Sequence, residues 1–227
     1  MRQLAGIPLL AAAFAVAEVA AAQTTRIADQ GSFTITQNGQ RIGREDFTIT
    51  ASPGGAGVEY SARATVQYGD RRLEPQLRTD SAGVAMSYEV TTRGANEPPT
   101  QWKGSIVRGM VSARIQTPRG ESAKEYIVTR GALVLDDEVF HQYFFVGRAN
   151  GQITAMLPRD NTQIRIRVER AGTERVAIGT REVEGTKLVL TEPSGTKREV
   201  WVDSEGRVLK VALPAKGIVA LRDDPPR

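Results

Sequence analysis

Hydrophobic and polar residues alternate along most of this chain. Ile164, Ile166 and Val168, for example, share one face of a run whose other positions are polar or charged. Such alternation is typical of a β-strand with one buried face. Turn residues such as Pro193-Ser194-Gly195 and Ser204-Glu205-Gly206 recur about every ten residues, as in an antiparallel meander. The pattern therefore predicts a mainly all-β protein.

The clearest hairpin signal is Asn38-Gly39, which lies between two alternating segments. This dipeptide favours a two-residue type I′ turn. Beyond the turn, Phe47 and Ile49 have the opposite parity to Ile42, so they would face the other side of a regular strand. A strand can keep one buried face across this change of parity only if it contains an extra residue. We therefore expect a β-bulge near Gly43.

The remaining strands follow the same alternation, with turns expected at Ala171-Gly172 and Glu184-Gly185. We expect one long strand over Trp102–Gln116, in which Gly104 and Gly109 indicate a bulge or strong coiling. Together these segments predict a single large coiled antiparallel meander sheet of about ten to twelve strands, an incomplete barrel. The other expected strands are Val58–Tyr68, Arg72–Thr79, Val84–Thr92, Glu121–Thr129, Ile153–Leu157, Thr162–Arg170, Arg175–Glu184, Lys187–Glu192, Lys197–Val202, Arg207–Leu213 and Ile218–Arg222.

One stretch, residues 133–148, departs from the alternation and gathers aromatic side chains. Phe140 and Phe144 are four residues apart, so a helix would place them on one face. The acidic pair Asp136-Asp137 suits a helix start, because a carboxylate caps the first N–H groups and complements the helix dipole. We therefore expect one short helix near 137–147, packed at the concave side of the sheet.

A large sheet without a second layer must bury its inner face against its own curvature, the helix or a ligand. The plain interpretation is that the aromatic side chains fill the core. The functional interpretation is that they line a pocket for an apolar ligand. The candidate lining residues are Trp102, Phe140, Tyr143, Phe144 and Trp201.

His141 is the only histidine, and it follows Asp137 and Glu138 closely enough for a helix to bring them within reach. A metal site needs three or four ligands, and the chain has no Cys, so we expect no metal and a surface or interfacial His141. The sequence shows no nucleophile elbow, P-loop, dinucleotide fingerprint or zinc-protease motif. We therefore assign no catalytic residue and no cofactor, and we favour a binding protein over an enzyme.

The N-terminus is typical of a secretory signal peptide, with a short basic start, an apolar run and small residues at Ala20-Ala21-Ala22. The apolar run is shorter than the roughly 20 residues of a membrane-spanning helix. We expect residues 1–22 to be cleaved before Gln23, leaving 23–227 as one β-rich domain in the periplasm or outside the cell. The tail Asp223–Arg227 is expected to be frayed.

The net charge is +4, from 30 Lys and Arg against 26 Asp and Glu. The plain interpretation is that basic residues occupy the solvent-facing positions of the strands. The sharper interpretation is contact with anionic lipid head groups or polyanionic envelope sugars, which a mild positive field attracts. No basic run with interleaved aromatic residues is present, so we expect no nucleic-acid partner.

Three motifs carry a resemblance to a group of exported bacterial proteins of unknown function. They are Phe33-x-Ile35-x-x-Asn38-Gly39-x-x-Ile42-Gly43, Leu135-Asp136-Asp137-x-Val139-Phe140-His141-x-Tyr143 and Trp201-Val202-Asp203-x-x-Gly206-Arg207-Val208-Leu209-Lys210. In architecture such proteins are similar to the periplasmic lipoprotein carriers LolA and LolB, in which a coiled sheet wraps an apolar cavity lidded by helices. The resemblance implies an open β-barrel, and it places no functional residue in this chain.

We therefore expect a periplasmic binding or carrier protein for an apolar or amphipathic envelope molecule, such as a lipid or a lipid-linked compound. The alternative is a non-enzymatic protein–protein interaction module of the cell envelope. A large exposed apolar patch or an unpaired edge strand would favour that alternative. A hydrolase of unknown type is the third hypothesis. In each case we expect no transmembrane anchor.

Overall fold

The computed structural model describes residues 24–55, 57–149 and 151–227, so the predicted signal peptide lies outside the described residues. Fifteen strands form one sheet. In chain order they are β1 (Arg26–Gln37), β2 (Gln40–Gly54), β3 (Gly57–Tyr68), β4 (Arg71–Thr79), β5 (Ala85–Arg93), β6 (Thr100–Val107), β7 (Met110–Thr117), β8 (Gly120–Ile127), β9 (Leu133–Val134), β10 (Gly151–Leu157), β11 (Thr162–Ile178), β12 (Arg181–Thr191), β13 (Lys197–Val202), β14 (Val208–Leu213) and β15 (Ile218–Arg222).

The strand order across the sheet is β8-β7-β6-β5-β4-β3-β2-β1-β15-β14-β13-β12-β11-β10-β9. Neighbouring strands are antiparallel except β9 and β10, which pair in parallel. In the described part of the chain the two ends of this order do not pair with each other, so the barrel is incomplete. These findings confirm the predicted fold class, although the strands are more numerous than the sequence pattern indicated.

The predicted hairpin and its bulge are both confirmed. Asn38 and Gly39 have φ angles of 50° and 81° and form the two-residue turn between β1 and β2. The register then shifts at Ile35, which pairs with Gly43 and leaves Ile42 as the extra residue. The bulge restores one buried face to the second half of β2.

The expected long strand over Trp102–Gln116 is wrong, because a turn at Arg108 and Gly109 divides it into β6 and β7. Both turn residues have positive φ angles, 52° and 86°, and arginine is not a residue that marks such a turn. Gly104 forms no bulge. A Cβ atom there would lie 2.5 Å from the Trp102 ring, so the glycine makes room for the indole.

The turns predicted at Ala171-Gly172 and Glu184-Gly185 are also wrong. β11 continues through Gly172, where the register to β12 shifts and the φ angle is 112°. Gly185 lies inside β12, and the chain instead reverses at Gly179. A glycine with positive φ supports either a turn or a bulge, so these positions do not distinguish the two from sequence alone.

The α-helix in the described part of the chain, α1 (Tyr143–Val146), is shorter than the 137–147 helix that the sequence predicted. The preceding residues form turns. The backbone N–H groups of Phe140 and His141 donate to the carboxylate of Glu45 rather than to carbonyl groups one helical turn earlier. A buried side chain therefore replaces the helical hydrogen bonds at these positions.

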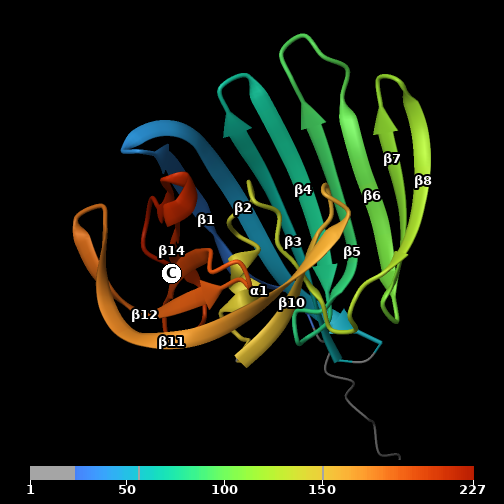
Figure 1. Ribbon diagram of the computed structural model, residues 1–227. Helices are drawn as coiled ribbons and strands as arrows, with labels where there is room; N and C mark the ends of the chain where they lie inside the picture. The colour runs from blue at the N-terminus through green and yellow to red at the C-terminus, as the bar shows by residue number, and fades with distance from the viewer. Residues whose placement is uncertain (1–23, 56, 150) are drawn as a thin grey trace, which may run out of the picture.

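The sheet curls until its β9 end approaches β5, where the N–H of Ala85 donates to the carbonyl of Ala132 at 3.2 Å. Figure 1 shows α1 inside the curl, with β11 and β12 on one side and β3 to β8 on the other. The strands β6, β7 and β8 continue past β5 as a wing of the sheet (Figure 1). The 133–148 stretch thus fills the concave side, as predicted.

The chain ends in a short 3-10 helix, η1 (Pro214–Lys216), then β15 and a tail that begins at Asp223. The Asp223 carboxylate accepts hydrogen bonds from Ser32 at 2.6 Å and Thr34 at 2.7 Å, and it pairs with Arg44 at 2.6 Å. The first residue of the tail is therefore held to β1 and β2. None of the described helices has the length and apolar character needed to cross a bilayer.

Candidate functional site

Four of the five predicted ligand-lining residues lie together in the main core, each 4% exposed or less. They are Trp102, Phe140, Tyr143 and Phe144. The Trp102 ring lies against Tyr88, and the Phe144 ring meets Tyr60 edge to face, with ring centroids 5.9 Å apart in each pair. Neighbouring side chains therefore surround these rings, and a ligand-lining role for them stays a prediction.

The fifth residue, Trp201, lies on the opposite face of the sheet. Its neighbours in β13, Val200 and Val202, belong to the main core, whereas Trp201 packs in a separate cluster with Val176 and Ile178 of β11. These two residues belong to the long β11–β12 hairpin, which is strongly bent (Figure 1). The structure therefore does not bring Trp201 to the other four candidates.

The expectation of a surface or interfacial His141 is wrong. Its side chain is fully buried, and its Nδ1 lies 2.5 Å from Oε1 of Glu45, which is also fully buried. The ring stacks on Phe47, with centroids 5.9 Å apart. The other ring nitrogen, Nε2, has no hydrogen-bond partner among the described residues. This arrangement fixes the 133–148 stretch to β2, and it leaves the imidazole without access to solvent.

The acidic residues of the stretch bind arginines rather than His141. Asp136 is buried, pairs with Arg159 and accepts a hydrogen bond from Tyr88 at 3.1 Å. Glu138 pairs with the same arginine at 2.7 Å and with Arg71. Within the described residues, no three His, Cys, Asp or Glu side chains are grouped to hold a metal ion. The cluster therefore ties the stretch to β4, β5 and the residues after β10.

Asp137 connects the stretch to the other side of the curl. Its carboxylate pairs with Arg198 at 2.7 Å and with Lys216 at 2.6 Å. Burial opposes ionisation of Asp137 and Glu138, but hydrogen bonds and charges from their basic partners outweigh it, so both carboxyl groups have a lowered pKa. Burial also raises the pKa of the Tyr88 hydroxyl, which therefore stays protonated.

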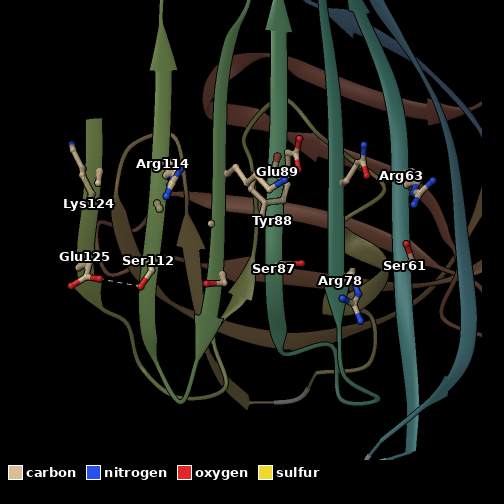
Figure 2. A pocket seen from close by; sticks show the side chains of 16 residues that line it. Ser61, Arg63, Arg78, Ser87, Tyr88, Glu89, Ser112, Arg114, Lys124 and Glu125 are labelled. Carbon is tan, nitrogen blue, oxygen red and sulfur yellow. Dashed lines mark hydrogen bonds and ion pairs between the residues drawn. The ribbon is translucent and has the colours of Figure 1, made fainter. Parts of the chain in front are cut away.

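The outer face of β3 to β8 carries an open groove with a volume of about 670 Å³. Its walls come from the polar positions of these strands, which alternate with the buried core positions. Figure 2 shows Arg63, Arg78, Glu89 and Arg114, which project from β3, β4, β5 and β7 on this face. The lining residues are Ser61, Arg63, Gln76, Arg78, Ser87, Tyr88, Glu89, Lys103, Gly104, Ser105, Ser112, Ala113, Arg114, Ala123, Lys124 and Glu125.

The groove has more positive than negative charge, because four cationic side chains of the outer face, Arg63, Arg78, Lys103 and Arg114, line it with two acidic ones. Lys103 pairs with Glu89 at 3.2 Å inside the groove. Arg63 has no ion-pair partner among the described residues, and its side chain is exposed. The groove also presents four serine hydroxyls. This chemistry suits an anionic group with oxygen acceptors.

An apolar patch adjoins the groove on the same face. Val107, Met110 and Ile127 are 64%, 45% and 74% exposed and lie side by side across β6, β7 and β8. Two residues along each strand, the groove residues Ser112 and Glu125 occupy the next positions of that face. The outer face of the wing therefore offers a charged groove beside an apolar surface.

Sequence reasoning missed this surface. Its residues are ordinary polar strand positions spread over six strands, and only the register brings them together. The strand predictions assigned Arg63, Arg114 and Glu125 to strands but gave no pairing between distant strands. The detectable signal was the unusual apolar residue at a solvent-facing position, as in Ile127, which breaks the polar face of β8.

No family model matches this chain, and no curated protein matches it. The β-barrel-like protein of domain of unknown function DUF1849 from Brucella abortus is similar in structure, with a TM-score of 0.46, 9% identity, and coverage of 85% of this chain and 94% of that chain. A DUF1329 family protein from Desulfovibrio piger gives a TM-score of 0.27 and 12% identity over 92% of this chain and 87% of that chain. At these scores the likenesses assign no activity or ligand, and the resemblance to LolA and LolB stays a prediction.

Proposed function

We propose that this protein is a non-enzymatic binding protein of the cell envelope that holds an anionic, amphipathic molecule on the outer face of β3 to β8. The groove takes the anionic head group, and the patch of Val107, Met110 and Ile127 takes part of the apolar chain. The observation that carries the proposal is the juxtaposition of a groove with surplus positive charge and an exposed apolar patch. Both parts are open to solvent, so a ligand reaches them without a conformational change.

The concave side of the sheet is a less suitable ligand site than the outer face. Phe140, Tyr143 and Phe144 are buried among other side chains, so a ligand there would have to displace them. The buried pair of Glu45 and His141 holds these rings in place. A hydrolase based on His141 is also less well supported. Its imidazole would need to reach a nucleophile and water, but the His141 side chain is fully buried.

The test is the binding of dodecyl phosphate, measured by isothermal titration calorimetry below its critical micelle concentration. Lys103→Glu should weaken binding by about tenfold or more, because it replaces an attractive charge in the groove, on the same strand as Val107, with a repulsive one. Rising salt should weaken wild-type binding, since the groove is exposed. Ile127→Ser should also weaken it, by removing apolar contact area.

The matched control is Arg41→Glu, which makes the same charge change at an exposed position of β2 away from the groove. It should leave the affinity for dodecyl phosphate unchanged. Comparison with inorganic phosphate and dodecyl maltoside separates the contributions of head group and chain. Equal affinities for dodecyl phosphate and dodecyl maltoside, or equal weakening by Arg41→Glu and Lys103→Glu, would overturn the proposal.

Export has its own test. The predicted signal peptide implies that the mature chain begins at Gln23. Intact mass spectrometry of protein recovered from the envelope of its host should give the mass of 23–227. A full-length mass in the cytoplasmic fraction would contradict an envelope location, and it would leave the groove test unaffected.

A further inference from the structure

The strand β8 is an open edge of the sheet. It stands at one end of the strand order, and among the described residues β7 is its one neighbour in the sheet. Seven of its eight positions are exposed, and Tyr126 is half-buried. The opposite edge differs, because β9 has two residues, Leu133 and Val134, and both are buried. The fold therefore protects one edge and presents the other to solvent.

The β7–β8 pairing identifies which backbone groups of the edge are free. The N–H of Val128 donates to the carbonyl of Gly109 at 2.8 Å, just beyond the strand end. Residues of an antiparallel strand alternate between bonding one neighbour and facing the other side. Tyr126, Lys124 and Ser122 therefore bond to β7. The N–H and C=O groups that face away from β7 belong to Glu121, Ala123, Glu125 and Ile127.

The side chains of β8 define what kind of strand would fit beside it. On the outer face, Glu125 has no ion-pair partner among the described residues, and Glu121 is 3.7 Å from Arg114 with both side chains exposed. Ile127 adds the exposed apolar end of that face. On the inner face Lys124 likewise lacks an ion-pair partner among the described residues. Directly opposite residues of paired strands interact, so complementary charges there stabilise the pairing.

We infer that β8 is a docking edge for an extended segment of another protein, which adds to the sheet as a sixteenth strand. The segment carries basic side chains opposite Glu121 and Glu125, an acidic one opposite Lys124 and an apolar one opposite Ile127. Main-chain hydrogen bonds to the four outward-facing residues give affinity, and this alternating charge pattern gives specificity. The inference goes beyond the proposed amphiphile site, because it stands on the unpaired backbone of β8 and needs no occupied groove.

The experiment uses an acetylated, amidated peptide, Val-Val-Lys-Glu-Val-Thr-Lys, which matches residues 127 to 121 in an antiparallel arrangement. Fluorescence anisotropy should show saturable binding to the wild-type chain. A charge-swapped peptide, Val-Val-Glu-Lys-Val-Thr-Glu, should bind at least about tenfold more weakly. Amide hydrogen exchange should slow at Ala123, Glu125 and Ile127 on binding, whereas the amides of Ser122 and Lys124 are already protected by β7.

The variant Ala123→Pro removes one outward N–H group and places a proline ring where the added strand would lie. The hydrogen bonds between β8 and β7 are kept, because they come from the residues on either side, Ser122 and Lys124. The variant should lower peptide affinity at least about tenfold. Ala123→Val, which keeps the N–H group, should retain binding. If circular dichroism shows that Ala123→Pro does not fold, Glu125→Lys serves instead and should weaken binding of the matched peptide.

Three outcomes would overturn the inference. One is equal binding of the two peptides, and another is a slowed exchange confined to residues outside β8. The third is concentration-dependent self-association of the wild type that Ala123→Pro abolishes, since a second copy would then be the occupant. Lys103→Glu separates this inference from the proposed function, because it should weaken dodecyl phosphate binding without changing peptide affinity.

Discussion

The carboxylate of Glu45 holds the backbone and the ring of His141 at once. Its oxygens accept hydrogen bonds from the N–H groups of Phe140 at 2.7 Å and His141 at 2.9 Å, and Oε1 lies 2.5 Å from the imidazole Nδ1. Both side chains are fully buried. A residue of β2 thereby fixes the aromatic stretch that fills the concave side, from a position 96 residues away in the chain.

Glu45→Ala should lower the free energy of unfolding by about 3–5 kcal/mol, because it leaves three buried groups without their partner: the N–H groups of Phe140 and His141 and the imidazole Nδ1. The control is Asp46→Ala at the next position, whose exposed ion pair with Arg44 contributes about 1 kcal/mol or less. Urea denaturation followed by tryptophan fluorescence measures both. Equal and small losses in the two variants would show that the Glu45 contacts do not hold the stretch in place.

Stability should fall in acid through Asp137 and Glu138. Both have a pKa lowered from ordinary values of 3.8 and 4.5, because their basic partners outweigh the cost of burial. A lowered folded-state pKa gives stability that is present above the ordinary value and is lost as the pH falls through the folded value. Urea midpoints measured from about pH 7 down to about pH 3 should therefore drop below about pH 4.5.

The control for this pH dependence is the double variant Asp137→Asn and Glu138→Gln. It should be less stable than wild type near neutral pH, because the amides lose the charge of their ion pairs. Its stability should change less steeply below about pH 4.5, since neither group then titrates. An acid slope identical to that of the wild type would assign the pH dependence to other carboxyl groups.

Features set by adjacent residues could be predicted from the sequence. The Asn38-Gly39 turn and the bulge at Ile42 follow from local dihedral preferences and from the parity of apolar positions. The turn at Arg108 could not be predicted, because arginine rarely adopts a positive φ angle and carries no turn signal. Gly172 looked like a turn because a bulge and a turn use the same glycine dihedrals.

Features set by distant residues could not be predicted. Spacing placed Asp137 and Glu138 near His141, but the partner of the imidazole is Glu45 of β2. The sequence also grouped Trp201 with the other large aromatic residues, although its place in the alternation of β13 puts it on the opposite face from Val200. Strand parity could have separated them, whereas the Glu45 contact depends on how the whole sheet curls.

Gly104→Ala tests the close packing of β6 against the core. The added Cβ would lie 2.5 Å from the Trp102 ring, which is buried and backed by Tyr88, so the indole would have to move. Overpacking of this kind costs about 1–3 kcal/mol. Gly94→Ala is the control, since its Cβ would meet its nearest neighbour at 3.6 Å, an ordinary contact. Thermal or urea unfolding should show a loss for Gly104→Ala alone.

Trp201→Ala tests whether the outer cluster holds the end of the β11–β12 hairpin. Trp201 packs against Val176 and Ile178, and its Nε1 donates to Glu174 at 2.7 Å. Removing a buried indole costs about 3–5 kcal/mol where the site cannot collapse. Because this cluster lies outside the main core, the loss should be local: amide exchange should speed up around residues 174–183 and stay unchanged in β3 to β8.

The companion variant is Trp201→Phe, which keeps an aromatic ring for the cluster but removes the hydrogen bond to Glu174. It should protect the hairpin amides to a level between those of the wild type and Trp201→Ala. Uniformly faster exchange across the whole sheet in both variants would contradict a local role. Trp201 would then stabilise the main core as well, through β13, whose Val200 and Val202 lie on the inner side.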